Sequence, residues 1–239
     1  MSISSNNPIR LSSRLMTAAG CVRPGSSIAD VGTDHAYLPA YLILSGLSQS
    51  AAITDIADGP LARAQETVRK YNLQDRIKLY KTNGLEGVPP ADDVFICGMG
   101  GELILDIILQ TPWLKDSGRQ IICQPMTRAY LLRRGLYSHG FEIYREIPTL
   151  CDRSSYIIIC ARYCGNPREV DDFAAYCGLA ANDSSAAAKA YLGSVLDHAR
   201  KKANGTRQQK WYDLCERIEK NTRRCGGTLF TKEGRGLNN

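Results

Sequence analysis

Short apolar runs alternate along much of the chain with longer stretches in which apolar residues recur at helical spacing. Several of the runs end in glycine, aspartate or asparagine, which is typical of buried strands in a parallel sheet. The predicted strands lie at 27–31, 51–56, 76–81, 93–97, 120–123, 141–147 and 156–161. The predicted helices lie at 9–21, 36–45, 60–70, 102–109 and 127–138. This alternation predicts an α/β fold, in which the last two strands close the sheet across a short polar loop.

The C-terminal part of the chain has helical spacing only. Residues 165–167, Gly-Asn-Pro, interrupt the pattern after the last predicted strand, as a domain boundary does. The apolar residues beyond this break form two sets at helical spacing: Leu192, Val195, Leu196 and Ala199, and then Trp211, Leu214, Cys215 and Ile218. Asn204 and Gly205 lie between the sets and predict the turn of an antiparallel helical hairpin. We expect the two apolar stripes to pack on each other and to bury Trp211.

These patterns divide the chain into two expected domains. Residues 1–164 are expected to form the α/β domain, with a helix from residues 1–22 that covers the ligand crevice. Residues 165–239 are expected to form a helical domain with a flexible tail from residue 226. A chain of 239 residues is long enough for one full α/β domain and a smaller appendage.

Composition narrows the class of protein. The hydrophobic content of 44% is ordinary for a globular protein. No stretch approaches the roughly 18 consecutive apolar residues that span a membrane, and the N-terminus has no apolar signal region. We therefore expect a cytoplasmic protein that does not enter a membrane.

The nine cysteines are scattered and odd in number. Cys97, Cys123 and Cys160 lie in or at the end of predicted core strands, where cysteine behaves as a small hydrophobe, and this pattern suits a reducing compartment. There is no C-x-x-C motif, and the three histidines are far apart in the sequence. Cys160 and Cys164 are the one pair spaced closely enough for a metal or redox role. We predict no metal site.

Positive charge is concentrated near the C-terminus. The chain has a formal net charge of +6, and the segment 198–224 accounts for all of it, with nine basic and three acidic residues. Such a segment is typical of a surface that binds a polyanion such as nucleic acid. A solvated helix face gives the same pattern.

The most distinctive stretch is SIADVGTDHAYLP, at residues 27–39. An apolar strand ends there at Gly32, which permits a sharp turn and the close approach of a ligand, and Asp30, Asp34 and His35 surround the turn. The first strand of a nucleotide-binding α/β sheet has this form. The pattern lacks the second and third glycines of a dinucleotide fingerprint, which argues against an NAD-dependent oxidoreductase. An ordinary strand-to-helix turn with a capping aspartate is the structural alternative.

Three later strand ends supply further candidates. Asp55 follows Asp30 by 25 residues, near the spacing at which a carboxylate holds the ribose of an adenosine cofactor. The amide of Asn83 both donates and accepts, as an adenine edge requires, although Asn83-Gly84 is also a common plain turn. The glycines of residues 98–101 permit close backbone approach after the fourth strand. We expect the first and fourth strands to flank the point where the strand order reverses and a ligand binds.

Together these segments resemble the bacterial tRNA (adenine(22)-N1)-methyltransferase family. The resemblance rests on DVGTDHAYLP, DIADGP, NGLEG, ICGMGG and the Gln-Pro after the fifth strand, and it covers residues 11–162. It implies a Rossmann-like sheet of seven strands, the last antiparallel, that binds S-adenosylmethionine, followed by coiled-coil-like helices. It also implies methylation of N1 of adenine 22 in the D-arm of tRNA.

The resemblance assigns cofactor contacts residue by residue. It places Asp30 and Gly32 beside the methionine part of the cofactor, and Asp55 at the ribose. Asn83 would face the adenine, where many relatives have aspartate; asparagine keeps an acceptor there. The candidate cofactor-binding residues are Asp30, Gly32, Thr33, Asp55, Ile56, Asn83, Gly84, Gly98 and Met99.

Asp34 and His35 match the most characteristic pair of that family and are the candidate catalytic residues. Unpaired adenine has a free lone pair at N1, so its attack on the sulfonium methyl needs no strong base, and positioning and electrostatics carry the acceleration. The product ring is cationic, so we expect Asp34 to orient the exocyclic amine or to accept its proton. His35 either orients Asp34 or the substrate, or has a purely structural role at the helix start. Residues 98–101 replace the N-P-P-Y type motif of enzymes that methylate exocyclic adenine nitrogens, which fits attack by a ring nitrogen.

The expected partner is tRNA, bound by a monomer. The target base lies in folded RNA, so we expect it to flip into the pocket while shape and phosphate contacts recognise the rest. The candidate RNA-binding residues are Arg14, Gln124, Pro125, Arg200, Lys201, Lys202, Arg207 and Lys210. A hydrolase is disfavoured because there is no G-x-S-x-G motif. The remaining alternative is a non-catalytic RNA-binding protein that retains a cofactor pocket.

Overall fold

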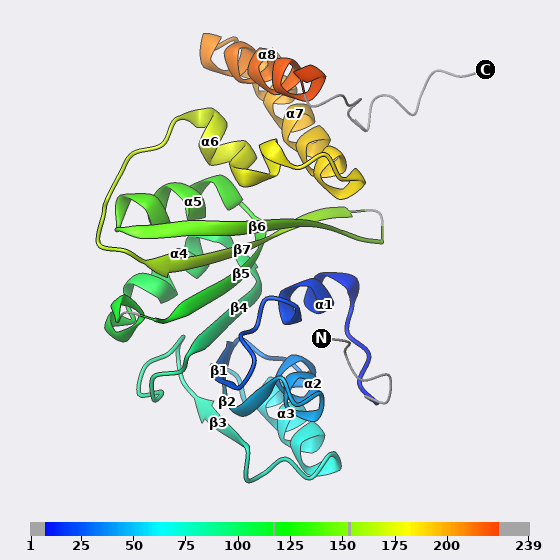
Figure 1. Cartoon of the computed structure of the whole chain (residues 1–239), viewed down its shortest axis with the longest axis vertical. Helices are drawn as coiled ribbons and strands as arrows, with labels where there is room; N and C mark the ends of the chain where they lie inside the picture. Colours follow the sequence, from blue (N-terminus) through cyan, green and yellow to red (C-terminus); the bar gives the residue numbers. More distant parts are fainter. Residues whose placement is uncertain (1–7, 117, 153, 225–239) are drawn as a thin grey trace, which may run out of the picture.

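The centre of the structure is a seven-stranded mixed sheet (Figure 1). This computed structural model describes residues 8–116, 118–152 and 154–224. The strands lie in the order β3-β2-β1-β4-β5-β7-β6. Their bounds are Ser26–Val31 for β1, Ser48–Asp55 for β2, Ile77–Lys81 for β3, Asp93–Gly100 for β4, Gln120–Thr127 for β5, Phe141–Cys151 for β6 and Ser154–Tyr163 for β7.

The topology confirms the predicted fold class. Strands β1 to β5 pair in parallel, and β7 runs antiparallel to both of its neighbours. The strand order reverses between β1 and β4, so the carboxyl ends of these two strands flank the switch point as predicted. The motif-bearing turn after β1 therefore opens at the place where a doubly wound sheet binds its ligand.

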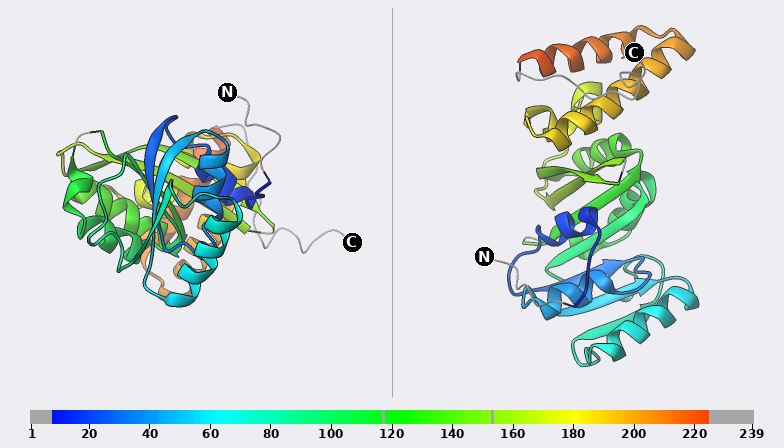
Figure 2. Two further views of the ribbon diagram at one scale, coloured as in Figure 1. Left: turned by 90° about the horizontal axis from the view of Figure 1, so that it is seen from below. Right: turned by 90° about the vertical axis from the view of Figure 1, so that its right-hand side faces the viewer.

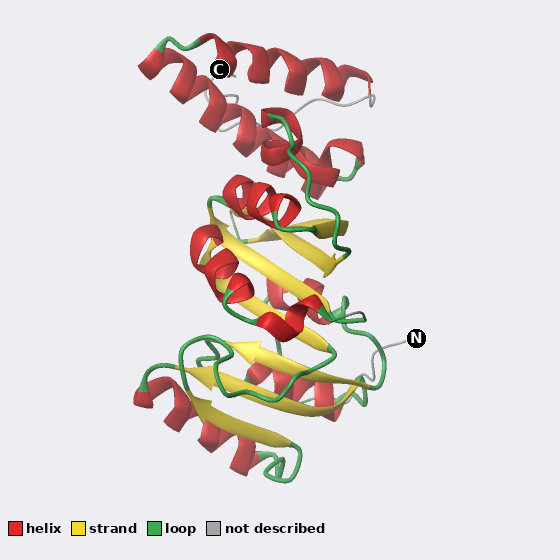
Figure 3. Ribbon diagram, turned by 90° about the vertical axis from the view of Figure 1, so that its left-hand side faces the viewer, coloured by secondary structure: helices red, strands yellow, loops and turns green. Residues whose placement is uncertain are grey.

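Helices cover both faces of the sheet and leave each face with its own apolar core (Figures 1 and 3). One core joins β-strand residues to α1 (Ser13–Ala19), α2 (Tyr37–Leu44) and α3 (Asp58–Lys70). The other joins them to α4 (Gly101–Leu109) and α5 (Ala129–Ser138), together with the short 3-10 helix η1 (Pro112–Lys115). This two-layer cover explains why the central strands read as continuous apolar runs.

Strands β4 to β7 all extend further than the sequence predicted. β4 was expected to end at Cys97 and instead continues to Gly100, because irregularities in its pairing with β5 accommodate the glycines. Gln124 and Pro125 were expected to follow the fifth strand and instead lie inside β5, opposite Cys97 and Met99. The hairpin of β6 and β7 is likewise longer than predicted.

The N-terminal helix is shorter than predicted. α1 begins after Ser12 and ends before Gly20, whereas apolar spacing predicted a helix over 9–21. Ile9 is buried in the same core without being helical, so its apolar character reflects packing of the chain that leads into α1. Apolar spacing alone does not separate these two ways of burying a side chain.

The C-terminal helices lie beyond the β6 edge of the sheet, at the end of the molecule opposite β3 (Figures 1 and 2). They are α6 (Asp172–Cys177), α7 (Ala186–Thr206) and α8 (Gln209–Arg224), with the 3-10 helix η2 (Gly178–Asn182) between α6 and α7. The apolar stripes of α7 and α8 join one core, and Trp211 is 8% exposed, which confirms its predicted burial. The predicted tail from residue 226 lies outside the described residues.

The turn between α7 and α8 is not where the sequence placed it. Asn204 and Gly205 are helical, and α7 ends only at Thr206. The chain reverses at Arg207, whose φ of 54° is a left-handed helix cap. An exposed Asn-Gly pair weakens a helix without ending it when the flanking turns pack on a neighbouring helix, as they do here.

Two features are absent from residues 8–116, 118–152 and 154–224. None of their helices has both the length and the apolar content to cross a membrane. No group of three or more His, Cys, Asp or Glu side chains among them is placed to hold a metal ion. Cys160 and Cys164 are both free, and the Cys164 thiol donates to the carbonyl of Gly140.

Candidate active site

The turn after β1 is fixed by its own backbone. Gly32 has a φ of 71°, and the N–H groups of Gly32 and Thr33 both donate to the carbonyl of Thr54 at 2.8 and 3.2 Å. The Thr33 hydroxyl accepts from the N–H of Ala36 at 3.2 Å, just before α2 begins. The positive φ favours glycine at position 32, because L side chains rarely adopt this backbone conformation. A Cβ there would also meet the terminal methyl group of Met99, a flexible side chain on β4.

This turn, α1 and the end of β4 enclose a cavity of about 280 Å³. Seven of the residues predicted from sequence line it: Arg14, Asp30, Gly32, Thr33, Asp34, His35 and Gly98. The cavity also uses side chains that the sequence analysis did not assign, including Leu15, Tyr37 and Cys97. Tyr37 lies in the motif DVGTDHAYLP and Cys97 in ICGMGG, so membership of these motifs could have marked both as cavity residues.

Asp30 is a buried acid at the base of this cavity. Its exposed fraction is 6%, and burial raises its pKa to about 7, with an opposing contribution from the hydrogen bond to the Thr33 side chain. Among the described residues, no basic side chain forms an ion pair with Asp30. A cationic group placed in the cavity would therefore find a matching carboxylate already in position.

Asp34 is exposed and held by a partner that sequence reasoning missed. Its Oδ1 accepts from the guanidinium of Arg63 on α3, through Nε at 2.9 Å and through Nη2. This hydrogen bond and the nearby His35 lower the pKa of Asp34, so the carboxylate is ionised at neutral pH. The Nε2 atom of His35 lies 3.3 Å from Asp34 Oδ2, and its ring stacks on Tyr37 with centroids 5.1 Å apart. Arg63 is an exposed residue of an amphipathic helix, so its place in the sequence gave no sign of this role.

The remaining cofactor candidates do not line this cavity. Asp55 and Ile56 follow β2, where Asp55 Oδ1 accepts from the N–H of Ala57 at 2.8 Å and Ile56 is 69% exposed. The end of β3 is tied to the same point, because the N–H of Thr82 donates to the Asp55 carbonyl at 3.1 Å. The next two residues, Asn83 and Gly84, face a separate hollow of about 500 Å³ on the α4 side.

The family of methyltransferase domains matches residues 11–159, which is more than half of the chain. The chain belongs to the methyltransferase domain family. The motif-bearing turn, the switch point and the cavity all lie within the matched segment.

This methyltransferase domain protein is similar in sequence to a characterised type of tRNA methyltransferase. The chain is 35% identical over 158 residues to the tRNA (adenine(22)-N(1))-methyltransferase of Bacillus subtilis (strain 168), in an alignment that covers 65% of this chain and 66% of the relative. It therefore spans just under two thirds of that relative. This similarity confirms the resemblance that the motifs indicated.

Solved structures extend the likeness to the C-terminal helices. The crystal structure of the B. subtilis M1A22 tRNA methyltransferase TrmK matches with a TM-score of 0.77 and 28% identity, covering 90% of this chain and 98% of that one. The structure of M. capricolum TrmK in complex with S-adenosyl-homocysteine matches with a TM-score of 0.73 and 27% identity, again covering 90% and 98%.

The RNA-binding candidates of this methyltransferase domain protein fall into two groups. In the first, Arg14 on α1 donates to Gln124 Oε1 at 2.5 Å, and its guanidinium lies 6.0 Å from the ring centroid of Tyr156. Gln124 and Pro125 are buried in β5, so Gln124 holds Arg14 against the rim of the cavity. The sequence named both residues of this pair but gave no sign that they touch.

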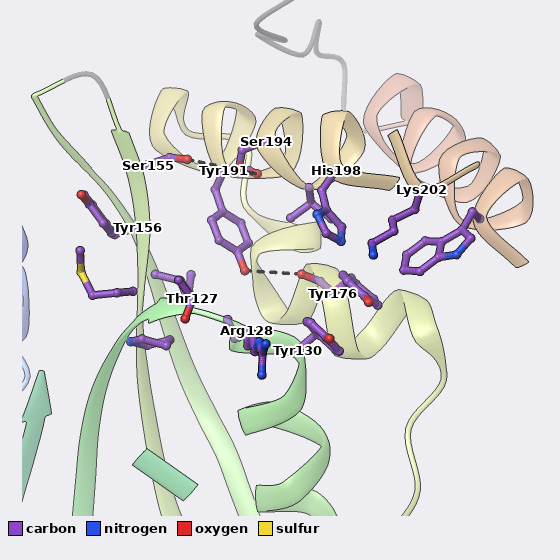
Figure 4. A pocket seen from close by; sticks show the side chains of 16 residues that line it. Thr127, Arg128, Tyr130, Ser155, Tyr156, Tyr176, Tyr191, Ser194, His198 and Lys202 are labelled. Carbon is purple, nitrogen blue, oxygen red and sulfur yellow. Dashed lines mark hydrogen bonds between the residues drawn. The ribbon is translucent and has the colours of Figure 1, made fainter. Parts of the chain in front are cut away.

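The second group lies on α7 and α8, and it does not form one cluster. Arg200 is paired with Glu219 at 2.8 Å, and Lys210 lies 5.4 Å from the ring centroid of Trp211. Lys201 and Arg207 are exposed. Lys202 alone of these candidates lines a second cavity, of about 610 Å³, between the end of β5 and α7 (Figure 4). This cavity is called the β5–α7 cleft below.

Proposed function

We propose that this chain transfers the methyl group of S-adenosylmethionine to N1 of adenine 22 in the D-arm of tRNA. The observation that supports this most is the convergence of Asp30, Gly32, Asp34 and Gly98 on one cavity at the switch point, in a chain similar to TrmK over nearly its whole length. The activity is assigned to the cytoplasm and to a single chain, with the α/β domain (1–164) for chemistry and the helical domain (165–239) for tRNA.

The residues fit the cofactor. Asp30 is a buried carboxylate without a basic partner among the described residues, which suits the ammonium group of the methionine part. Gly32 leaves the turn open above it, and Met99 covers this place with a flexible side chain that can move aside. Asp55 and Ile56 would hold the ribose, and Asn83 and Gly84 the adenine. When bound, the cofactor supplies an electrophilic methyl group on a sulfonium.

The chain contributes positioning and charge. The carboxylate of Asp34 is ionised at the mouth of the cavity, where it would accept a hydrogen bond from the exocyclic amine of the target adenine. As N1 gains its methyl group, positive charge spreads to that amine, and the Asp34 carboxylate stabilises it or takes its proton. Arg63 and His35 orient this carboxylate from two sides. We assign His35 as a positioning residue on this geometry.

The test is transfer of labelled methyl from S-adenosylmethionine to an unmodified tRNA transcript, followed by nucleoside mapping. We expect 1-methyladenosine at position 22, and a fall in rate of about 100-fold or more in Asp34→Ala, because a charge-stabilising group at the reacting base is lost. Asp75→Ala, which removes an exposed carboxylate in the loop before β3, is the matched control and should keep the wild-type rate.

Titration with S-adenosyl-homocysteine keeps the test specific. Asp34→Ala should bind this product with little change, because Asp30, Gly32 and Asp55 are intact. If the wild-type chain bound tRNA and cofactor but formed no 1-methyladenosine, the proposal would fail and the non-catalytic RNA-binding alternative would replace it. Methylation at another tRNA position would overturn the site assignment and leave the methyltransferase activity standing.

A further inference from the structure

The β5–α7 cleft is built from parts of the chain that are far apart in sequence. Residues 125–130, which run from the end of β5 into the first turn of α5, and residues 155–157 of β7 form one wall. The other wall consists of side chains from α6, α7 and α8, chiefly Tyr176, His198, Lys202 and Trp211. Figure 4 shows His198 and Lys202 reaching from α7 toward Tyr176 and Tyr130. Tyr156 lines this cleft, and its ring centroid lies 6.0 Å from the guanidinium of Arg14, which lines the candidate active-site cavity.

Aromatic rings form a continuous ladder in the cleft. Tyr130 stacks on Tyr176 with centroids 4.4 Å apart, and Tyr176 stacks on His198 at 6.1 Å. Trp211 meets both Tyr176 and His198 edge-on, at 5.5 and 5.9 Å. His198 is exposed and Tyr130 half-buried, so the ends of the ladder face the cleft. A planar base that enters the cleft can therefore stack on the end of this row of rings.

The charge of the cleft suits an anion. None of its 16 lining residues is acidic, whereas Arg128 and Lys202 are basic. Arg128 is already paired with Glu102 on α4, but the Lys202 ammonium forms no ion pair with any carboxylate of the described residues. Burial and the nearby Lys202 and Lys201 lower the pKa of His198, so its ring is neutral at pH 7 and adds a stacking surface.

We infer that the β5–α7 cleft binds an unstacked nucleotide of the substrate tRNA other than the target adenine. Its phosphate lies at Lys202, and its base extends the ladder at Tyr130. Aromatic platforms beside a cation are how proteins hold single-stranded nucleic acid, and a flipped target base leaves neighbours without their stacking partners. The inference rests on the proposed function, since it assigns a second contact surface to the same substrate.

The test measures tRNA affinity in the presence of S-adenosyl-homocysteine, without catalysis, by fluorescence anisotropy over a range of salt concentrations. Lys202→Ala removes one phosphate contact, so the slope of log Kd against log salt should fall by about one. Tyr130→Leu removes stacking but no charge, so affinity should fall by about tenfold or more while the slope stays unchanged. A change in the salt slope therefore reports the phosphate contact of Lys202, and a change in affinity at constant slope reports the stacking contact of Tyr130.

Two matched controls lie outside the cleft. Lys189→Ala removes the same charge from α7, nearly four helical turns before Lys202, and Tyr212→Leu removes an exposed tyrosine from α8. Both should bind tRNA as the wild type does. Titration with S-adenosyl-homocysteine should give wild-type affinity in all four variants, which shows that each is folded.

The outcomes distinguish this inference from the proposed function. If the wild-type chain methylates tRNA while Lys202→Ala and Tyr130→Leu bind it with wild-type affinity and salt slope, the inference is overturned and the proposed function stands. Equal losses in Lys189→Ala and Lys202→Ala would also overturn it, because they would show a diffuse electrostatic surface. If the wild-type chain binds no tRNA, both fail together.

Discussion

The active-site cavity and the β5–α7 cleft are assembled in opposite ways. The turn between Asp30 and His35 supplies five of the residues that the sequence predicted for the cavity, and the turn is fixed by hydrogen bonds to the adjacent strand β2. The cleft takes its lining from β5, α5, β7, α6, α7 and α8, so no short motif encodes it. A site carried by one turn is readable from sequence, whereas a site between two layers depends on how the layers are joined.

A buried ion pair between Arg133 and Glu146 connects the α/β layer (the sheet with α5) to the helical layer (α6, α7 and α8); it is called the Arg133 joint below. Arg133 on α5 is fully buried, and its Nε donates to Glu146 of β6 at 2.7 Å. The same guanidinium donates to the carbonyls of Ala175 and Tyr176 on α6, at 2.8 and 3.0 Å, and to the hydroxyl of Tyr191 on α7. One side chain thus connects the α/β layer with two helices of the cleft.

The largest expected effect is at this joint. Arg133→Met should lower the free energy of unfolding by about 3–5 kcal/mol, because the buried side chain of Glu146 loses its guanidinium partner and, among the described residues, keeps only the N–H of Leu179 as a donor. Urea unfolding measures the change. The folded fraction should still bind S-adenosyl-homocysteine, since Arg133 does not line the active-site cavity, and it should bind tRNA more weakly because the cleft is no longer held.

A neighbouring arginine provides the control for this comparison. Arg134 also connects α5 to α6, through Asp172, but both side chains are about 40% exposed. Arg134→Met should therefore cost less than about 1 kcal/mol. The double variant Arg133→Met/Glu146→Met should recover much of the lost stability, because an apolar pair replaces a buried ionic one. Equal losses at 133 and 134 would show that burial does not decide the strength of the joint.

The same contrast explains what the sequence predicted. The positions of the strands and the turn at Gly32 followed from apolar runs and glycine positions, which act locally, whereas the seven-stranded sheet was implied by the family resemblance. Arg133 gave no signal, because it looks like any other polar residue of an amphipathic helix until α6 covers it. The predicted break at Asn204-Gly205 was wrong because packing on α8 keeps α7 helical there.

The candidate active-site cavity allows a different test, because the ionisation of Asp30 makes the free energy of unfolding depend on pH. Asp30 has an ordinary pKa of about 4 in the unfolded chain and about 7 in the folded one. Between these values the folded state binds more protons than the unfolded state, so stability falls as pH rises through this window, by at most about 1.4 kcal/mol per pH unit. Above pH 7 the contribution of Asp30 is constant.

Asp30→Asn isolates this contribution. Its free energy of unfolding should lack the decline between pH 5 and pH 7, so it should gain on the wild type as pH rises. Urea unfolding of the ligand-free protein at several pH values measures the difference. If the free energy of unfolding changed with pH in the same way in both proteins, Asp30 would be ionised over the whole range from pH 5 to pH 7. The free-energy cost of burying its carboxylate in the cavity would then be lower than its burial implies.

The smallest expected effect returns to the helical layer. Ser185 caps α7, because its hydroxyl accepts from the N–H of Ala188 at 3.1 Å. Ser185→Ala should cost about 1 kcal/mol of unfolding free energy. Ser184→Ala, one residue earlier and outside the cap, is the matched control with no expected change. α7 carries both His198 and Lys202. Loosening its first turn therefore tests whether tRNA binding in the cleft depends on the whole helix or only on the Arg133 joint. Unchanged tRNA affinity in Ser185→Ala would assign that role to the joint, and a loss as large as that of Lys202→Ala would assign it to the helix.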